Sequence, residues 1–286
     1  MKLKPRTITS IDELNKLHSK KELTGLFELP NELYHSGPGL SSTQLKKLIT
    51  DPPAKFLEPN KKSDALDFGN AFHTAALEPH NWEKDVAVFT KGKTLKSKAA
   101  DEFKLLHPNK YVITQTDELT ISCMASKVND HPKVKTLLNN SLKEISAYCY
   151  DESGELLKAR ADILFTGSQL IFADFKTIRD TSDDYIQKEI ANRLYYFSAA
   201  MYLEVFSNVL GMQFDEFIWI FCGKESPYTI ETWRCGEMTL DKGRELLKKS
   251  LRIYKSCNDF EYWPSSSNKL HTFDLNDYQI RKFEDE

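Results

Sequence analysis

The sequence predicts a mixed α/β (α+β) fold, in which a central mixed β-sheet is flanked by helices. Segments that alternate or run apolar over strand length gather between residues 144 and 235. Segments with apolar residues at helical spacing precede, interrupt and follow them. The chain has 286 residues, 40% of them hydrophobic, which is enough for a substantial core. Helices around a mixed sheet are the packing that buries both kinds of element.

The N-terminal third is expected to be mainly helical. Residues 1–30 are polar and weakly patterned, and we expect them to form a loose arm within an N-terminal extension over 1–33. A single domain is expected over 34–286. Its first helices are predicted at SSTQLKKLI, at SDALDFGNAFHTAALEP and, after the basic loop of TKGKTLKSKAADEFKLL, near its end. A further helix is predicted from a cap at Asp117 to about Leu138.

The sheet is expected to begin at Glu144. EISAYCY and LLKARADILF are strand-like and joined by DESGE, a turn composition, and TGS makes the next turn before QLIFADFKT. A long helix is predicted over about 184–210, then the strands EFIWIFC and YTIETWRC, and an amphipathic helix over about 237–258. The tail from WPSSSN is expected to be a loop.

The composition argues against several classes of protein. The net charge of −3 names no partner, so a nucleic-acid-binding surface would need locally concentrated positive charge. No apolar run approaches the roughly 20 residues of a membrane span, and the basic N-terminus lacks the apolar segment of a signal peptide. The five cysteines form no CxxC pair, which argues against a zinc or iron–sulfur site and for a cytoplasmic protein with reduced thiols.

The segment LIFADFKTI, residues 170–178, places an acid and a base near the end of a strand otherwise built for a core. Side chains alternate along a strand, so Asp174 and Lys176 share a face. The preceding strand carries Asp162, and the turn near Gly167 makes positions 162 and 174 face each other in a tight hairpin. Two such carboxylates repel, and each raises the pKa of the other. A divalent cation between them removes this penalty, and oxygen ligands suit Mg²⁺ or Mn²⁺.

A lysine beside such a metal site has a chemical use. Metal-bound water loses a proton more readily, and an adjacent ammonium orients it and stabilises charge in the transition state. Attack on a phosphodiester needs this set of groups. The alternative is a surface ion pair of little energetic value, because the same acid-x-Lys spacing occurs in the predicted helix at Glu102 and Lys104.

Several segments, in one order over about residues 34–210, resemble a known family. ARAD and DFKT, separated by 11 residues, look like the active-site signature of the PD-(D/E)XK nuclease superfamily, with Ala161 where a proline often stands. LSSTQLKKLITDPPAKF, ALDFGNAFHTAALEP, KEISAYCYDESGELLKARADIL and YYFSAAMYL resemble segments of one branch, the exodeoxyribonuclease VIII group of phages and prophages. The resemblance therefore implies a PD-(D/E)XK restriction-endonuclease-like core.

The resemblance also implies a metal site. The ligands that it implies are His73, Asp162, Asp174 and the carbonyl oxygen of Phe175. Lys176 would position the nucleophilic water, and Glu144 would help to hold the metal or its water. The alternatives are a packed, hydrogen-bonded histidine at 73 and an ordinary edge-strand charge at 144.

Contacts to DNA are expected near this site. The resemblance places Tyr202 on a helix beside it, although an aromatic core stripe would explain this tyrosine as well. Glutamine usually stands four residues before the tyrosine, and here that position is Ser198, whose shorter side chain loses the contact or makes it through water. Arg160 shares a strand face with Asp162. Four lysines within eight residues are candidates to bind phosphates, or else form a solubilising loop: Lys91, Lys93, Lys96 and Lys98.

These expectations describe an Mg²⁺-dependent DNA exonuclease, with Mn²⁺ able to substitute. The resemblance implies degradation of the 5′ strand of linear duplex DNA, a ring-like homo-oligomer, a single-strand annealing protein as partner in recombination, and a place in the cytoplasm of a bacterial host. Two rivals remain: a PD-(D/E)XK endonuclease or nickase, and a catalytically silent DNA-binding module of the same fold.

Overall fold

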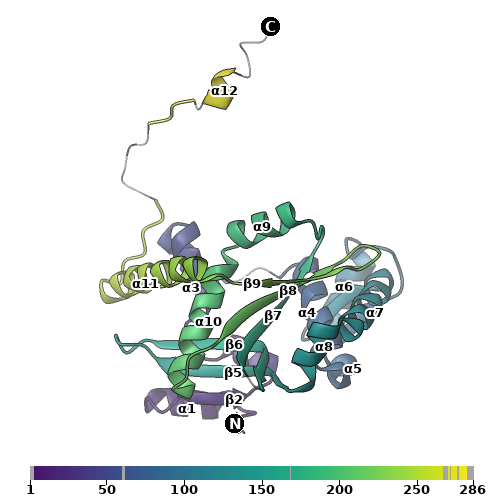
Figure 1. The fold of residues 1–286 in the computed structure, drawn as a ribbon, viewed down its shortest axis with the longest axis horizontal. Coiled ribbons are helices and arrows are strands. Elements are labelled where there is room, and N and C mark those ends of the chain that lie inside the picture. The colour runs from purple at the N-terminus through teal and green to yellow at the C-terminus, as the bar shows by residue number, and fades with distance from the viewer. Residues whose placement is uncertain are drawn as a thin grey trace.

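The computed structural model describes residues 3–59, 62–167, 169–266, 270, 272–275 and 277–281. It confirms the mixed α/β fold with a central sheet between helices (Figure 1). The seven strands of that sheet are ordered β1 (Arg6–Thr7), β2 (Gly25–Glu28), β5 (Ser141–Tyr150), β6 (Leu156–Thr166), β7 (Leu170–Ile178), β8 (Glu216–Gly223) and β9 (Ile230–Arg234). The pairs β1–β2 and β7–β8 are parallel and the rest antiparallel, so the sheet is mixed.

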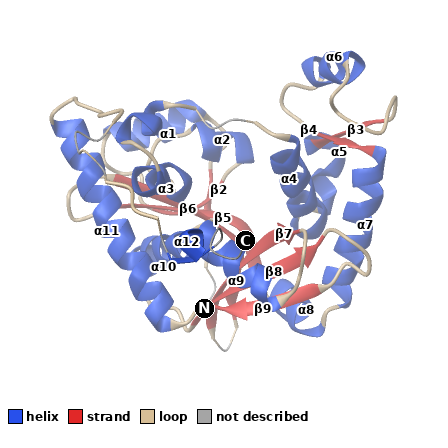
Figure 2. Cartoon of the chain, turned by 90° about the horizontal axis from the view of Figure 1, so that it is seen from above, coloured by secondary structure: helices blue, strands red, loops and turns tan. Residues whose placement is uncertain are grey.

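Helices cover both faces of the sheet (Figure 2). One face packs against α3 (Ser42–Thr50), α10 (Tyr195–Leu210) and α11 (Glu237–Asp259), and the other against α4 (Asp64–Leu77), α7 (Gln115–Asp130) and α8 (Pro132–Asn139). The remaining elements are α1 (Ile11–Ser19), α2 (Asn31–Ser36), α5 (Trp82–Asp85), α6 (Lys98–Leu106), α9 (Asp183–Asn192), α12 (Asp277–Arg281), two 3₁₀ turns at Pro53–Leu57 and Pro79–Asn81, and a small parallel pair, β3 (Val86–Phe89) and β4 (Tyr111–Thr114).

Strand β7 supplies apolar side chains to both cores. Phe172 is fully buried on the α10 face, where its ring stacks on Phe217 with 5.1 Å between centroids. Phe175 is fully buried on the α4 face, where Phe72 meets it edge-on at 5.6 Å. Because residues two apart share a face, Asp174 lies on the α10 side with Phe172. Packing on both faces thus fixes the position of β7 between α4 and α10.

The expectation of a loose arm over residues 1–30 was wrong. β2 pairs with β5 along its whole length, and β1 extends the sheet by one short strand. Leu14 and Leu23 are 0% exposed and pack with Phe27 in a core of their own. The polar composition hid this because few apolar residues suffice to bury one face of a helix and a four-residue strand.

A buried lysine fastens the segment after β2 to the sheet. Lys158 on β6 is 3% exposed, and its Nζ donates to the carbonyl oxygens of Tyr34 and Gly37, at 2.8 and 2.6 Å, at the end of α2. A cation is favourable there, because a helix leaves its last carbonyls unpaired. α2 is therefore fixed against the middle of the sheet.

Two predicted helices are each broken in two. The helix expected over 117–138 ends at Asp130, and a second helix begins at Pro132. The N-cap of the first helix is Thr114 and not Asp117, which instead completes the capping box by accepting from the backbone of Thr114. The helix expected over 184–210 is interrupted at Leu194, whose φ of 49° is left-handed. Proline disfavours helix in the residue before it, which explains the first break.

Parts of the sequence predictions fall outside the structure. Ser168 of the TGS turn and residues 267–269 of the tail lie outside the described residues.

Among the described helices, none combines the length and apolar character that a bilayer crossing needs.

Helix α11 approaches α10 closely at Gly243. A Cβ at this glycine would lie 2.4 Å from the Tyr196 carbonyl oxygen and 2.8 Å from the Cβ of Ala200. Backbone atoms cannot yield as a flexible side chain does, so only glycine allows this approach. The contact sets the position of the α10 turn that carries Ser198.

We predict that Gly243→Ala destabilises the protein by about 1–3 kcal/mol, because overpacking against the backbone of α10 outweighs the gain in helix propensity of about 1 kcal/mol. Chemical denaturation measures the difference. Gly236→Ala is the matched control, since a Cβ there meets nothing within 4 Å. Equal or higher stability of Gly243→Ala would contradict the close packing.

Candidate active site

The ladder between β5 and β6 is interrupted at one position. Within it, residues on both sides are paired, Lys143 with Ile163 and Ile145 with Ala161, whereas Glu144 and Asp162 between them are not. Glu144 has a φ of 51°, a left-handed conformation that costs a non-glycine residue roughly 1–3 kcal/mol. The strained residue is thus one of the predicted site residues.

The hairpin of β6 and β7 opens at the same place. Its register makes Asp162 and Asp174 opposite, as the sequence predicted, but the last pair is Ile163 with Ala173. Instead of continuing the ladder, Asp162 accepts a hydrogen bond through its Oδ2 from the amide of Phe175 at 2.8 Å. A side chain has replaced a backbone acceptor, and the strands separate around it.

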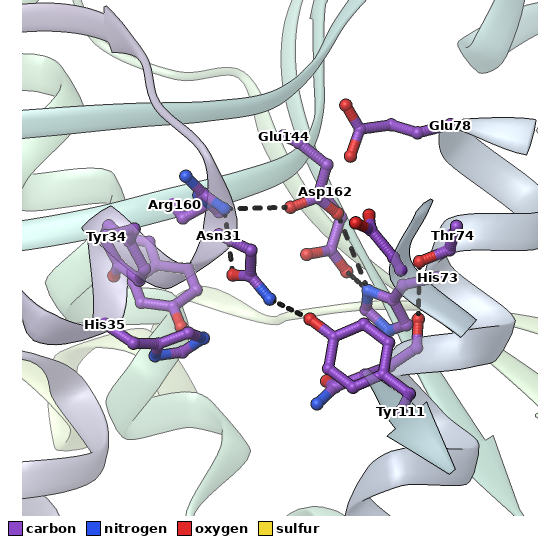
Figure 3. A pocket seen from close by; sticks show the side chains of 13 residues that line it. Asn31, Tyr34, His35, His73, Thr74, Glu78, Tyr111, Glu144, Arg160 and Asp162 are labelled. Atoms are coloured by element: carbon purple, nitrogen blue, oxygen red, sulfur yellow. Dashed lines mark hydrogen bonds and ion pairs between the residues drawn. The ribbon is translucent and has the colours of Figure 1, made fainter. Parts of the chain in front are cut away.

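Three ligand-type side chains converge in this opening (Figure 3). His73, in the third turn of α4, places its Nδ1 3.5 Å from Asp162 Oδ2 and 3.8 Å from Glu144 Oε1. One ligand atom from each of the three residues lies within 4.8 Å of the others. One imidazole nitrogen and two carboxylates form a donor set that suits a divalent cation.

Arg160 holds Glu144 from the other side. Its Nη1 lies 3.8 Å from Glu144 Oε2. Its other donors are used within the protein, by Ser146 Oγ at 3.0 Å, Asn31 Oδ1 at 3.0 Å and Leu29 O at 2.7 Å. With 8% exposure and this many partners, Arg160 has a positioning role, and its expected DNA contact stays a prediction.

Asp174 and Lys176 form the second half of the site. Their side chains make a close ion pair through Asp174 Oδ2, on the face of β7 that looks toward α10. That buried oxygen has no hydrogen bond among the described residues apart from this charge contact. The cluster around His73 does not include Asp174, and the role of the Phe175 carbonyl stays a prediction, since the contact observed at Phe175 is made by its amide.

Burial and mutual charge set the protonation of these groups. Burial lowers the pKa of His73, but the carboxylates of Asp162 and Glu144 outweigh it and raise the pKa to about 9. Burial raises the pKa of Asp162, opposed by the positive charge of His73. Burial lowers the pKa of Lys176, but Asp174 and Asp162 outweigh it, and the net pKa lies above its usual value. Lys176 therefore stays an ammonium at neutral pH.

Helix α10 forms the wall beside Asp174. Tyr202 lines the pocket, receives a hydrogen bond from Ser42 Oγ at 3.3 Å, and has a pKa raised to about 12, chiefly by burial. Ser198 is one turn earlier and half-buried. Both positions thus lie on the helix that packs beside Asp174 and Lys176.

The predicted lysine cluster is elsewhere. Lys91, Lys93, Lys96 and Lys98 are exposed and lie in the loop before α6 and at its first residue. This loop belongs with β3 and β4 at the outer end of the α4 side (Figure 2). None of the four lysines lines the described pocket, and their contact with DNA stays a prediction.

Sequence reasoning missed one wall of the pocket. A cavity of about 160 Å³ opens over His73 and Asp162, and its far side comes from α2 and from the start of β4. Asn31 joins the two, because it accepts from Arg160 and donates to the Tyr111 hydroxyl. Tyr34 lies over the guanidinium of Arg160, 4.6 Å from its ring centroid. Asn31 and Tyr34 lie just after the presumed loose arm, and no pattern marked either of them or Tyr111.

Comparisons with known proteins agree with this architecture. Residues 41–276 match the model of a family described as a PDDEXK-like domain of unknown function, DUF3799. The crystal structure of a protein named "Putative exonuclease" from Eubacterium rectale is similar over 88% of this chain and 98% of its own, with 12% identity and a TM-score of 0.62. A crystal structure named SSO0001 aligns over 75% of this chain and 86% of its own, with 15% identity and a TM-score of 0.30. No curated protein matches the sequence.

The chain belongs to the PDDEXK-like family DUF3799, because the match spans most of its length. The superfamily predicted from ARAD and DFKT is thereby confirmed. The solved structure from Eubacterium rectale supports the fold alone at this level of identity. The exodeoxyribonuclease VIII branch is not distinguished by these matches.

We predict that His73→Ala and Lys176→Ala separate metal binding from the rest of the site. Calorimetric titration with Mn²⁺ should show at least tenfold weaker binding for His73→Ala, since loss even of a residue that only hydrogen-bonds a metal ligand costs about 10–100-fold. Lys176→Ala should bind at least as well as the parent protein, because removal of the ammonium frees Asp174. Parent affinity in His73→Ala, with a lowered melting temperature, would make this histidine structural.

Metal binding should also depend on pH. A cation at His73 needs the neutral imidazole, whose proton is held with a pKa of about 9, so binding displaces a proton. Apparent affinity should therefore rise with pH from about 6 to about 9. Titrations in buffers of different ionisation enthalpy count the protons released, and the same experiment on His73→Ala should show fewer. An affinity independent of pH in this window would contradict coordination by His73.

Proposed function

We propose that this protein is a metal-dependent DNA exonuclease. The observation that carries the proposal is the convergence of His73, Glu144 and Asp162 at the opening of the sheet, with the Asp174–Lys176 pair beside it. The family match and the name of the similar solved structure support a nuclease. The substrate, linear duplex DNA, and the use of Mg²⁺ or Mn²⁺ come from the resemblance of the sequence segments.

The residues present fit a divalent cation. Three ligand atoms lie within reach of one ion, and the buried Oδ2 of Asp174 has no partner within the described residues except the ammonium of Lys176. In the free protein the protonated His73, Arg160 and Lys176 balance the charge of the three carboxylates, and a divalent cation would replace the proton of His73. His73, Glu144 and Asp162 would hold the ion, and Asp174 would join them by turning from Lys176. Carboxylate oxygens favour Mg²⁺, whereas the imidazole admits Mn²⁺.

When bound, such an ion lowers the pKa of water and polarises a phosphoryl oxygen. The residues of the chain do the rest. Lys176 remains charged, so it cannot accept a proton, and it is suited to hold the attacking water and to stabilise negative charge on the phosphate. Arg160 keeps Glu144 in place, and Asp162 is fixed by the Phe175 amide. The reaction is hydrolysis of a phosphodiester.

Finer features of the proposal rest on the resemblance to the exodeoxyribonuclease VIII group. They are degradation of the 5′ strand, a ring-like homo-oligomer around DNA, a strand-annealing protein as partner, phage-type recombination and the bacterial cytoplasm as the place of action. The rival activities are those of an endonuclease or nickase and of a silent DNA-binding module. The complete set of His73, Asp162, Asp174 and Lys176 favours an active enzyme over a silent one.

We predict that the purified protein degrades linear duplex DNA with Mg²⁺ or Mn²⁺, spares closed circular DNA, and stops in excess chelator. Lys176→Ala should stay folded but lose detectable cleavage, because it removes charge stabilisation; its melting temperature should fall, since the buried carboxylate of Asp174 loses its ion pair. Gel assays on both DNA forms check this. Nicking of the closed circle would support the endonuclease, and absence of cleavage with every metal would support the silent module.

A further inference from the structure

A second lysine stands beside the Asp174–Lys176 pair. Lys46 is half-buried on α3, one turn after Ser42, which contacts Tyr202 of α10. The Nζ of Lys46 donates to the carbonyl oxygen of Arg193, just before α10 begins, at 3.4 Å. Ser42 thus contacts the middle of α10, and Lys46, one turn later on α3, contacts Arg193 just before its start. Tyr195 comes two residues after Arg193, and the Nζ of Lys176 lies over its ring, 5.4 Å from the centroid, so Lys46 and Lys176 both reach the start of α10.

The charges around Lys46 are those of the candidate site. The pKa of Lys46 is lowered to about 8, chiefly by burial and then by the positive charge of Lys176, against the attraction of Asp174. Within the described residues the ammonium of Lys46 forms no ion pair, and its one hydrogen bond is the long contact to Arg193. A half-buried ammonium with unused donors beside another ammonium is unfavourable in the free protein.

An anion between the two ammonium groups removes that cost. Lys176 already shares its charge with Asp174, whereas Lys46 has no carboxylate partner in the part of the chain that the structure describes. A phosphate group carries several acceptor oxygens and can bridge two lysines that lie on different elements.

We propose that Lys46 binds a non-bridging oxygen of the DNA phosphate held beside Lys176, and so positions the strand for hydrolysis. This inference rests on the proposed function and adds a phosphate-binding residue to it. Lysine here acts on backbone charge and not on bases, so the contact is independent of sequence.

The test compares Lys46→Met, Lys46→Arg and Lys47→Met with the parent protein. Lys47 is the matched control on the same helix, where its Nζ donates to the Glu58 carbonyl oxygen at 2.6 Å. The probe is a short blunt-ended duplex with a 5′ phosphate, and its binding is measured by fluorescence anisotropy with Ca²⁺, which supports little turnover, at several salt concentrations. Cleavage with Mg²⁺ and melting curves are recorded for each variant.

Lys46→Met should bind the duplex about tenfold more weakly at low salt, with a salt slope smaller by about 1, as the loss of one phosphate contact requires. Lys46→Arg should recover most of the affinity, and Lys47→Met should match the parent. Parent-like affinity and slope in Lys46→Met, with cleavage intact, would overturn this inference alone. A parent protein that neither binds nor cleaves the duplex would overturn the proposed function and this inference together.

Discussion

The site depends on a gap in the hydrogen-bond ladders of β5, β6 and β7 at the level of Asp162. Between β5 and β6, Glu144 and Asp162 are left out of a ladder that is regular on either side. At the same level, the Asp162 carboxylate takes the acceptor position that the β6–β7 ladder vacates. An interrupted ladder is costly, and the left-handed backbone of Glu144 adds to the cost. The large apolar cores on both faces compensate for it and hold the gap open.

Each side of that gap is lined by elements from one face of the sheet. α4 brings an imidazole from the Phe72–Phe175 core, and α10 brings Tyr202 from the core that contains Phe172. Neither helix carries the acids themselves, which come from the sheet. The division of labour follows from packing, since strands fix the acids rigidly while each helix is placed by its own apolar stripe.

The sequence predicted the strands from 144 to 235 and the acids on them because β periodicity and a hairpin register are local. Asp162 opposite Asp174 follows from a short turn alone. The breaks at Pro132 and Leu194 were not predicted, because the apolar spacing continues through both of them. The protein partners of Arg160 were not predicted, for another reason. Its partners Asn31 and Leu29 are about 130 residues away in the chain, and no local pattern reveals such contacts.

The short N-terminal strands have a consequence for where the chain can be divided. The family match begins at residue 41, beyond β1, β2 and α2. A fragment cut there would expose the ten-residue strand β5 as a free edge, with unpaired amides and carbonyls ready to recruit another sheet. It would also lack α2, which lines the cavity, and with it Asn31, which hydrogen-bonds both Arg160 and Tyr111. The boundary of sequence similarity is therefore not a boundary of independent folding, because the first forty residues form the edge of the sheet and protect β5.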